Sequence, residues 1–294
     1  MHQLMDRIRL VLEAAVADGE AQGCPPKLAA AIRHAVFPGG ARIRPQLCLA
    51  VAAACGDDEP ALADGAAAAI ELLHCASLVH DDLPAFDDAA TRRGVPTVHC
   101  LFGERIAVLT GDALIVRAFQ AVAAGAGRAP HRLAPLMTTI AEGVGMPFGI
   151  VAGQAWECEP QVVLSDYQRA KTGALFAAAT MVGAQAAGAP AQPWRAFGHW
   201  LGEAYQVADD IRDAAADPAM IGKPTGRDVA LSRPSVAREL GVRAAISRFA
   251  SLVASTAAAI PECRGAAQLR ALVKIEAERL IPKAWSDELE RMAA

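Results

Sequence analysis

Aromatic residues are scarce in this sequence, and neither sign of charge dominates it. They make up 5% of the 294 residues, and β-branched residues are sparse beside alanine and leucine. Because alanine and leucine favour helices, whereas β-branched and aromatic residues favour strands, the composition predicts an all-α protein. The net charge of −4 argues against a nucleic-acid-binding surface.

The sequence also lacks the cysteine patterns of zinc sites and the apolar core of a signal peptide. None of its seven cysteines lies in a Cys-x-x-Cys motif, and an odd count in apolar surroundings indicates reduced, mostly buried thiols. We therefore expect a cytoplasmic protein. The least polar run, 172–191, contains Gln185 and several glycines, which favours a buried helix over a membrane span.

Hydrophobic periodicity predicts a single domain, 1–294, of about ten helices. Leu4, Ile8, Val11 and Ala15 repeat at helical spacing in the first, and glycine, proline or polar residues separate the others. The expected later ranges are 27–36, 42–54, 59–83, 103–125, 131–158, 165–188, 193–217, 233–256 and 264–291. No alternating strand pattern persists, and no linker divides the chain.

Carboxylates concentrate in the stretch from His80 to Pro96, which holds four aspartates and two adjacent arginines. Pro84 disfavours helical geometry in the residue before it, so the long helix should stop near Asp82, with Asp87 following in a turn. Carboxylates at the carboxyl end of a helix oppose its macrodipole, which is unfavourable unless cations neutralise them. A charged loop with local ion pairs is the alternative interpretation.

A second acidic group, DDIRD, lies far downstream. Asp209 and Asp213 are four residues apart, so a helix places both carboxylates on one face. A solvated acidic face is the alternative, but the preceding residues are largely apolar, and Gln206 adds a polar group one turn before Asp210. Because Mg²⁺ binds carboxylates together with substrate phosphates, the two clusters predict a diphosphate site with several Mg²⁺ ions.

Several motifs resemble those of the trans-isoprenyl diphosphate synthase (polyprenyl synthetase) family, with most similarity to its bacterial geranylgeranyl diphosphate synthases. They are PGGARIRPQL at 38–47, DDLPAFDD at 81–88 with RRGVPTVH, FGERIAVLTGDAL at 102–114, Gly153-Gln154, Lys171-Thr172-Gly173, Tyr205-Gln206, DDIRD, Gly222-Lys223 and Gly226-Arg227-Asp228. The resemblance covers residues from about 30 to 235. It implies an all-α terpenoid-synthase (isoprenoid synthase) helical bundle around a deep central cavity, in a homodimer.

The resemblance also implies roles for individual residues. The residues expected to hold about three Mg²⁺ ions are Asp81, Asp82, Asp87, Asp209 and Asp213. Those expected at the allylic substrate or its diphosphate are Arg92, Lys171, Thr172, Gln206 and Lys223, with Asp210 as a further substrate-binding candidate. Those expected at isopentenyl diphosphate are Arg42, Arg44, His74 and Arg93. The expected catalytic residues are Asp81, Asp82, Asp87, Lys171 and Lys223.

Three of these assignments compete with plainer interpretations. A lone histidine in an apolar helix is usually a satisfied core residue, but the seven-residue spacing to Asp81 puts His74 on the same helix face. Lys171 and Lys223 alone would be ordinary surface lysines. The sequence also departs from the family pattern at three places. Ala41 stands where a lysine is usual, so either Arg42 compensates or affinity for isopentenyl diphosphate is lower; Glu157 replaces an aspartate and keeps the charge. Arg233 and Ser235 replace the common lysine and threonine, so no role is assigned there.

The implied reaction is the Mg²⁺-dependent head-to-tail condensation of isopentenyl diphosphate with an allylic diphosphate (dimethylallyl, geranyl or farnesyl). Mg²⁺ and basic residues neutralise the leaving diphosphate, the allylic C–O bond breaks, and the double bond of isopentenyl diphosphate attacks the carbocation. The protein must orient both substrates and exclude water.

The residues expected to set product length are Leu73, Ala76, Ser77 and Phe119. One helical turn is 5.4 Å, about one extended isoprene unit. Relatives that stop at fifteen carbons commonly carry an aromatic residue at the position of Ala76, so we expect a longer product, geranylgeranyl diphosphate, and a role in carotenoid biosynthesis. The alternatives are a farnesyl diphosphate synthase, a terpene cyclase, a non-catalytic subunit of a heteromeric synthase, and a purely structural bundle.

Overall fold

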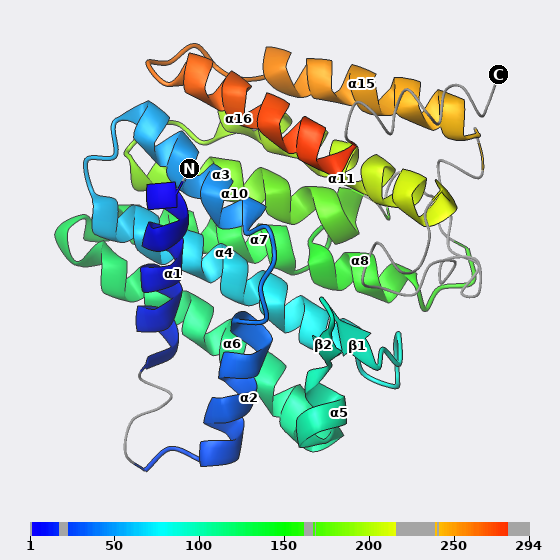
Figure 1. Cartoon of the computed structure of the whole chain (residues 1–294). Coiled ribbons are helices and arrows are strands. Elements are labelled where there is room, and N and C mark those ends of the chain that lie inside the picture. Colours follow the sequence, from blue (N-terminus) through cyan, green and yellow to red (C-terminus); the bar gives the residue numbers. More distant parts are fainter. Residues whose placement is uncertain are drawn as a thin grey trace.

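The computed structural model describes residues 2–17, 23–161, 167, 169–215, 239 and 241–281, apart from the side chains of His2, Asp213 and Ala215. These residues form stacked layers of helices with one short hairpin at an edge (Figure 1), so the all-α prediction is confirmed. The helices α15 (Val242–Ala258) and α16 (Ala266–Leu280) form the outermost layer, and α11 (Arg195–Ala215) lies beneath them.

The first four helices agree closely with their predicted ranges. They are α1 (His2–Ala17), α2 (Pro26–Val36), α3 (Ile43–Cys55) and α4 (Pro60–Asp81). Ile8, Leu12 and Val16 of α1 are buried at helical spacing. Gly56 ends α3 with a φ of 115°, a left-handed conformation that glycine adopts without steric cost.

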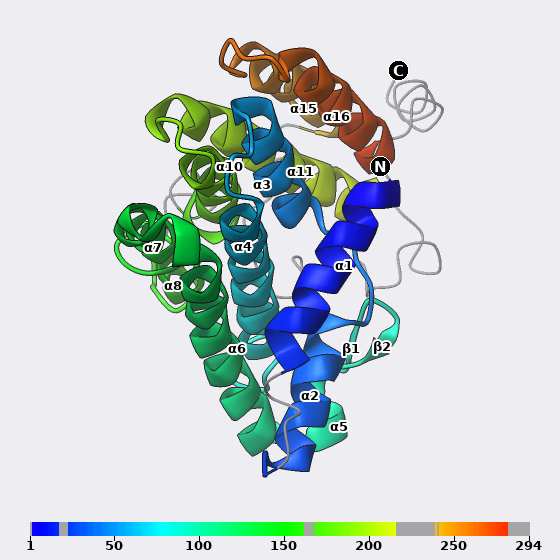
Figure 2. The same cartoon turned by 90° about the vertical axis from the view of Figure 1, so that its left-hand side faces the viewer.

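Helix α4 is the axis of the bundle. It contacts α3, α10 (Ala174–Ala186) and, most extensively, α6 (Glu104–Gly125) (Figure 2). A Cβ atom on Gly65 would lie 2.4 Å from the carbonyl oxygen of Ala121, and one on Gly125 would lie 2.4 Å from that of Ala61. The α4 and α6 backbones therefore touch at this level because glycines allow it.

The chain leaves α4 through a tight turn into a hairpin. Helix α4 ends at Asp81, as Pro84 predicts, and the Asp87 amide then donates to the carbonyl of Asp81 at 2.9 Å. The strands β1 (Thr91–Arg92) and β2 (Val95–Pro96) pair in antiparallel fashion. This hairpin was not predicted from the sequence, because two-residue strands are too short to show alternation. Helix α5 (Val98–Phe102) was not predicted either.

In the later part of the chain, the structure differs from two of the predicted helices. The helix expected over 131–158 is wrong: it is divided into α7 (Leu133–Val144) and α8 (Ile150–Trp156), because Gly145, Pro147 and Gly149 interrupt it. The described part of the 165–188 helix begins as a π-helical segment, η4 (Arg169–Gly173), before α10. Short 3₁₀ turns are η2 (Ala126–Arg128), η3 (Pro130–Arg132) and η5 (Gln192–Trp194).

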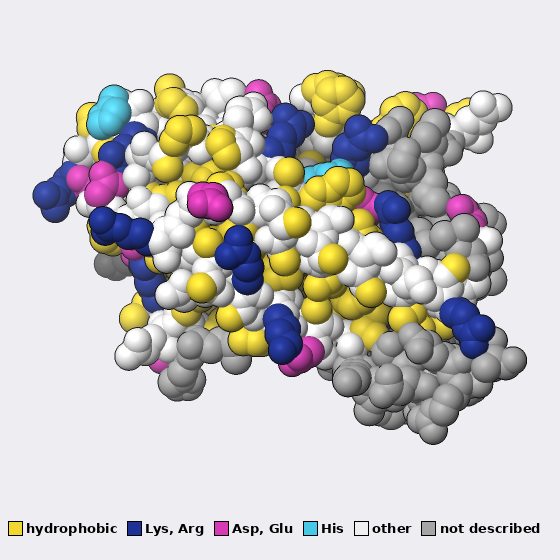
Figure 3. Space-filling view, turned by 90° about the horizontal axis from the view of Figure 1, so that it is seen from above, with side chains coloured by type: hydrophobic (Ala, Val, Ile, Leu, Met, Phe, Trp, Pro, Cys, Tyr) yellow, Lys and Arg dark blue, Asp and Glu magenta, His cyan; other side chains and the backbone are white. Residues whose placement is uncertain are grey.

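Two segments, Pro60–Asp81 and Glu104–Arg128, are long and apolar enough to cross a membrane by length and composition alone. Such helices are weak indications, because core helices have the same features, and 78% of the α4 window is buried inside the protein. Helix α10, in the least polar run of the sequence, is buried along almost its whole length, as expected. The face formed by α15 and α16 mixes basic, acidic and apolar side chains (Figure 3).

Candidate active site

The carboxyl end of α4 presents two largely buried aspartates. The side chains of Asp81 and Asp82 are 9% and 7% exposed. Asp81 Oδ1 lies 3.4 Å from Lys171 Nζ and 3.4 Å from Gln154 Nε2, and Asp82 Oδ1 accepts hydrogen bonds from Arg92 Nε (2.9 Å) and Nη2 (2.5 Å). The local pair with Arg92 fits a charged loop, but Lys171 and Gln154 come from distant segments, so the aspartates belong to a tertiary site.

The electrostatics at Asp82 favour a further cation. Burial raises the pKa of Asp82, and the charges of Asp81 and Asp87 add to this effect, while Arg92 opposes it. A carboxylate whose charged form stays disfavoured beside an arginine gains from additional positive charge. The half-buried Asp87 lies in the turn directly after α4, as predicted.

The π-helical segment η4 carries Lys171 and Thr172, and such segments are frequent at functional sites. Lys171 Nζ lies 2.7 Å from Glu157 Oε1, which also accepts a 2.5 Å hydrogen bond from the Tyr167 hydroxyl. Gly153 of α8 permits this close approach, because a Cβ there would lie 2.4 Å from Lys171 Cα. Glu157, where the family has aspartate, therefore holds Lys171 toward Asp81.

Helix α11 connects η4 to the second acidic cluster. The Thr172 hydroxyl donates to Gln206 Oε1 at 2.9 Å, and Gln206 Nε2 donates to Asp210 Oδ1 at 3.1 Å. Asp210 is 2% exposed, and Asp209 pairs with Arg212. These contacts bring the predicted residues Thr172, Gln206 and Asp210 together. The side chain of Asp213 and the whole of Lys223 lie outside the described residues.

A cavity of about 260 Å³ lies between α3, α4, the hairpin, α11 and α16. Its polar lining residues are Arg42, Arg44, Glu71, His74, Arg93, Tyr205, Asp209, Arg212 and Arg279. It thus contains His74 from the helix of the first acidic cluster, Arg93 from its loop and Asp209 from the second cluster. All four residues predicted at isopentenyl diphosphate, Arg42, Arg44, His74 and Arg93, line this cavity.

Arg44 supplies this cavity with an unsatisfied donor. Its guanidinium lies over the Phe176 ring at 4.4 Å, and its buried Nε has no hydrogen-bond partner among the described residues. A buried donor without a partner is costly unless a ligand satisfies it. Burial lowers the pKa of Arg44, and burial with the nearby arginines lowers the pKa of His74 well below its ordinary value. All three features favour an anionic ligand.

Arg42 lines the same cavity, but its guanidinium is already engaged. Arg42 Nη1 lies 2.5 Å from Glu71 Oε1, and Nη2 donates to the carbonyl of Val36. The backbone at Arg42 is left-handed, with a φ of 51°. That Arg42 compensates for Ala41 in binding substrate stays a prediction.

The residues expected to set product length lie along α4 and α6. Ala76 and Leu73 are 2% and 1% exposed and belong to the large apolar cluster between α4, α6 and α10. Phe119 of α6 packs against that cluster, and the Ser77 hydroxyl donates to the carbonyl of His74 at 2.8 Å. The four residues are thus placed on the two helices whose packing would bound a growing chain.

Metal binding requires the two acidic segments to act with a ligand. Among the described residues, no group of three or more His, Cys, Asp or Glu side chains could hold a metal ion by itself. The donor set fits Mg²⁺ nonetheless, because that ion takes one or two carboxylates and completes its shell with water and substrate phosphates. Asp81 and Asp82 provide such a pair at the end of α4.

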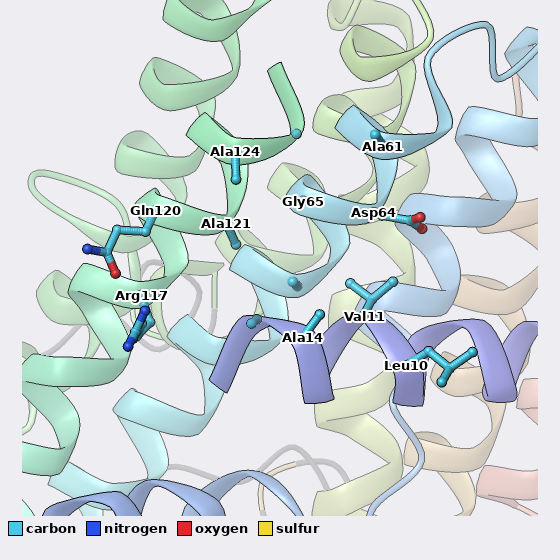
Figure 4. A pocket seen from close by; sticks show the side chains of 13 residues that line it. Leu10, Val11, Ala14, Ala61, Asp64, Gly65, Arg117, Gln120, Ala121 and Ala124 are labelled. Atoms are coloured by element: carbon cyan, nitrogen blue, oxygen red, sulfur yellow. The ribbon is translucent and has the colours of Figure 1, made fainter. Parts of the chain in front are cut away.

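A larger cavity, of about 410 Å³, lies apart from these residues, between α1, α4 and α6 (Figure 4). Small apolar residues such as Ala14, Ala121 and Ala124 line it, and Asp64 at its edge pairs with Arg7 at 2.7 Å. It contains none of the aspartates of the two clusters, so it is not the site that the motifs define.

Arg212 and Arg279 also line the basic cavity but were not predicted from the sequence. Arg212 lies within DDIRD but carries no signal of its own. Arg279 lies outside every motif, and only the packing of α16 brings it to α3 and α4.

Comparison with known proteins identifies the class of protein to which this fold and site belong. Geranyltransferase from Legionella pneumophila has a TM-score of 0.81, with 26% identity and 95% of each chain covered. Geranylgeranyl pyrophosphate synthetase from Pyrococcus horikoshii has a TM-score of 0.78 at 29% identity, covering 95% of this chain and 99% of the other. The geranylgeranyl diphosphate synthase of Cereibacter sphaeroides is 54% identical over 276 residues, 94% of this chain and 96% of the other.

The helical fold, with its buried aspartates and arginine-lined cavity, is that of an isoprenoid synthase. The family model "Polyprenyl synthetase" matches residues 25–258, and the chain belongs to that family. Members of this family catalyse prenyl chain elongation, so the resemblance inferred from the motifs is confirmed.

Proposed function

We propose that the protein is a geranylgeranyl diphosphate synthase that condenses isopentenyl diphosphate with an allylic diphosphate and uses Mg²⁺. The observation that carries the proposal is the basic cavity of Arg44, His74 and Arg93 together with the buried aspartates that end α4; the two are connected through Arg92, which pairs with Asp82 and precedes Arg93. The similarity to the Cereibacter sphaeroides enzyme over almost the whole chain supports the product.

The two substrates would occupy neighbouring subsites. Asp81, Asp82 and Asp87, with Asp209 and Asp213, would hold about three Mg²⁺ ions on the allylic diphosphate. When bound, the metal neutralises charge on the leaving diphosphate. Lys171, held by Glu157 and Asp81, adds a fixed positive charge on the same side. Isopentenyl diphosphate would lie in the basic cavity, so its double bond is directed at the allylic carbon.

Packing between α4 and α6 supports a product of about twenty carbons. Ala76 carries only a methyl group in the first turn before Asp81, and Leu73 lies one turn further from Asp81. Gly65 lies sixteen residues, or about four and a half turns, before Asp81. The backbones of α4 and α6 touch there, at the contact of Gly65 with Ala121. At about one isoprene unit per turn, that length of helix corresponds to about four units.

Product length tests this proposal directly. We expect purified protein, given Mg²⁺, isopentenyl diphosphate and each allylic primer in turn, to yield mainly the twenty-carbon diphosphate, as measured by chromatography. Ala76→Tyr should shorten the product to fifteen or ten carbons, because the ring fills the turn above Asp81. Ala30→Tyr, on an exposed position of α2, is the control and should change nothing. A fifteen-carbon main product from the wild type would contradict the proposal.

The same assay separates the alternatives. A farnesyl diphosphate synthase would stop at fifteen carbons, and a terpene cyclase would release a cyclic hydrocarbon from the primer alone. A non-catalytic subunit would be inactive in isolation; the intact aspartates of both segments speak against this. A role in carotenoid biosynthesis and a cytoplasmic location stay predictions from the sequence.

We propose that a second copy of the chain covers exposed apolar side chains on α6 and between α7 and α8. Leu109 and Val116 of α6 are 50% and 57% exposed and lie seven residues apart, hence on one helix face. Met146 and Phe148, between α7 and α8, are 70% and 68% exposed. Helices α6 and α7 are neighbours, and exposed apolar side chains on neighbouring elements are characteristic of a homodimer interface.

A further inference from the structure

We propose that Arg279, on α16, is an additional ligand for the diphosphate of isopentenyl diphosphate, and that Glu276 and Tyr205 position it. The inference rests on the proposed function, because it assigns Arg279 to one substrate of that reaction. The three side chains come from two helices, α11 and α16, that lie far apart in the sequence and pack beside each other in the fold (Figure 1).

The three groups form a closed set of hydrogen bonds. Arg279 donates to Glu276 Oε2 from Nε at 2.8 Å, and its Nη2 lies 2.7 Å from the same oxygen. Arg279 Nη2 also donates to the Tyr205 hydroxyl at 2.7 Å, and that hydroxyl donates to Glu276 Oε2 at 2.5 Å. The guanidinium is therefore fixed on one edge by two neighbours.

The other edge of Arg279 remains for a ligand. Its Nη1 makes no hydrogen bond to any described residue, and Arg279 lines the 260 Å³ cavity with Arg44 and His74. Glu276 is only 4% exposed, so the pair has a buried carboxylate side and an arginine side that is 41% exposed. A guanidinium held in this way binds phosphate oxygens with less loss of side-chain entropy than a free one.

The charged side chains that line the cavity favour the binding of an anion. Arg42 pairs with Glu71, Arg212 with Asp209 and Arg279 with Glu276. Arg44 and Arg93 have no carboxylate partner among the described residues, and Arg93 Nη1 donates to the carbonyl of Gly39 at 2.5 Å. The cavity thus carries more positive than negative charge, which suits a diphosphate.

The cavity distinguishes between the two substrates. Arg44, His74 and Arg93, which are assigned to isopentenyl diphosphate, line it, whereas Asp81, Asp82 and Lys171, which are assigned to the allylic diphosphate, do not. Asp209, the one allylic-side residue in the described lining, is paired there with Arg212. Arg279 should therefore affect isopentenyl diphosphate more than the allylic primer. A purely structural clamp between α11 and α16 is the competing explanation, and it predicts a loss of stability without selectivity between substrates.

Steady-state kinetics of Arg279→Gln provide the test. We expect the KM for isopentenyl diphosphate to rise about tenfold or more, with the KM for the allylic primer changed less than about twofold. Arg279→Lys should recover part of the loss, because it keeps the charge but not the fork geometry. Tyr205→Phe, which keeps the ring on Phe176 (centroids 4.8 Å apart), should raise the same KM by a smaller factor. Arg270→Gln, at an exposed position of α16, is the matched control.

Calorimetric binding of isopentenyl diphosphate without primer gives a readout independent of turnover. Weaker binding in Arg279→Gln, with wild-type circular dichroism and melting temperature, supports the inference even if the product differs from the proposed one. Unchanged binding and KM, or an increase confined to the allylic primer, would overturn it while leaving the proposed function intact. A wild type that neither binds nor consumes isopentenyl diphosphate would overturn both.

Discussion

The imidazole of His74 lies in a cavity that five arginine side chains line. Burial is the largest cause of its lowered pKa, and the charges of Arg44 and Arg93 follow. The ring is therefore neutral at neutral pH and can offer an N–H to an anion without a full charge of its own. Helical spacing predicted its position relative to Asp81, but the basic surroundings that set its charge come from other segments.

The pKa of His74 predicts a specific pH dependence of stability. Because its folded-state pKa lies below the unfolded value near 6.5, the folded state binds fewer protons below that pH. The contribution of neutral His74 to the free energy of unfolding is thus complete above pH 6.5. It is lost as the pH falls from 6.5 toward the folded-state pKa of His74. Urea unfolding should show the wild type losing up to about 1.4 kcal/mol per pH unit relative to His74→Gln. Parallel curves would contradict this, and His131→Gln, at an exposed turn, is the control.

At the scale of whole elements, the sequence predicted the helices whose ends are set by nearby residues in the chain. Pro84 sets the end of α4, and helical periodicity sets α1. The break between α7 and α8 was missed although Gly145 and Pro147 are visible, because the apolar residues on both sides continue the period. The contribution of α16 could not be predicted, since Arg279 reaches the cavity only through tertiary packing.

The close approach of the α4 and α6 backbones at their glycine contacts can be tested by substitution. Gly65→Ala would place a Cβ 2.4 Å from the backbone oxygen of Ala121, where no flexible side chain can yield. We expect a loss of about 1–3 kcal/mol in the free energy of unfolding, measured by chemical denaturation. Gly127→Ala, whose Cβ would have no atom within 4 Å, should differ little from the wild type. An equally stable Gly65→Ala protein would mean that the two helices separate at little cost.

At the scale of the molecule, the site exists only because distant segments meet around α4. Asp81 ends that helix, Lys171 comes from a π-helical segment ninety residues later, and Arg279 comes from α16. The motifs identified most of these residues in order, but they carried no information on which arginines share one cavity. Because these arginines line one cavity, the basic subsite is distinct from the acidic subsite at the end of α4. Two adjacent subsites of opposite charge suit a reaction that joins two diphosphates.

Helix α6, which packs on α4, carries the exposed residues Leu109 and Val116 of the proposed dimer interface, so substitutions there test assembly without changing the candidate active site. We expect sedimentation analysis to show a dimer for the wild type and a monomer for the double variant Leu109→Glu and Val116→Glu. Two carboxylates on that face would be desolvated without partners in a dimer. Ile275→Glu, at a position of α16 that is 46% exposed, is the control and should remain dimeric. A monomeric wild type, or a double variant that still dimerises, would show that α6 does not form the interface.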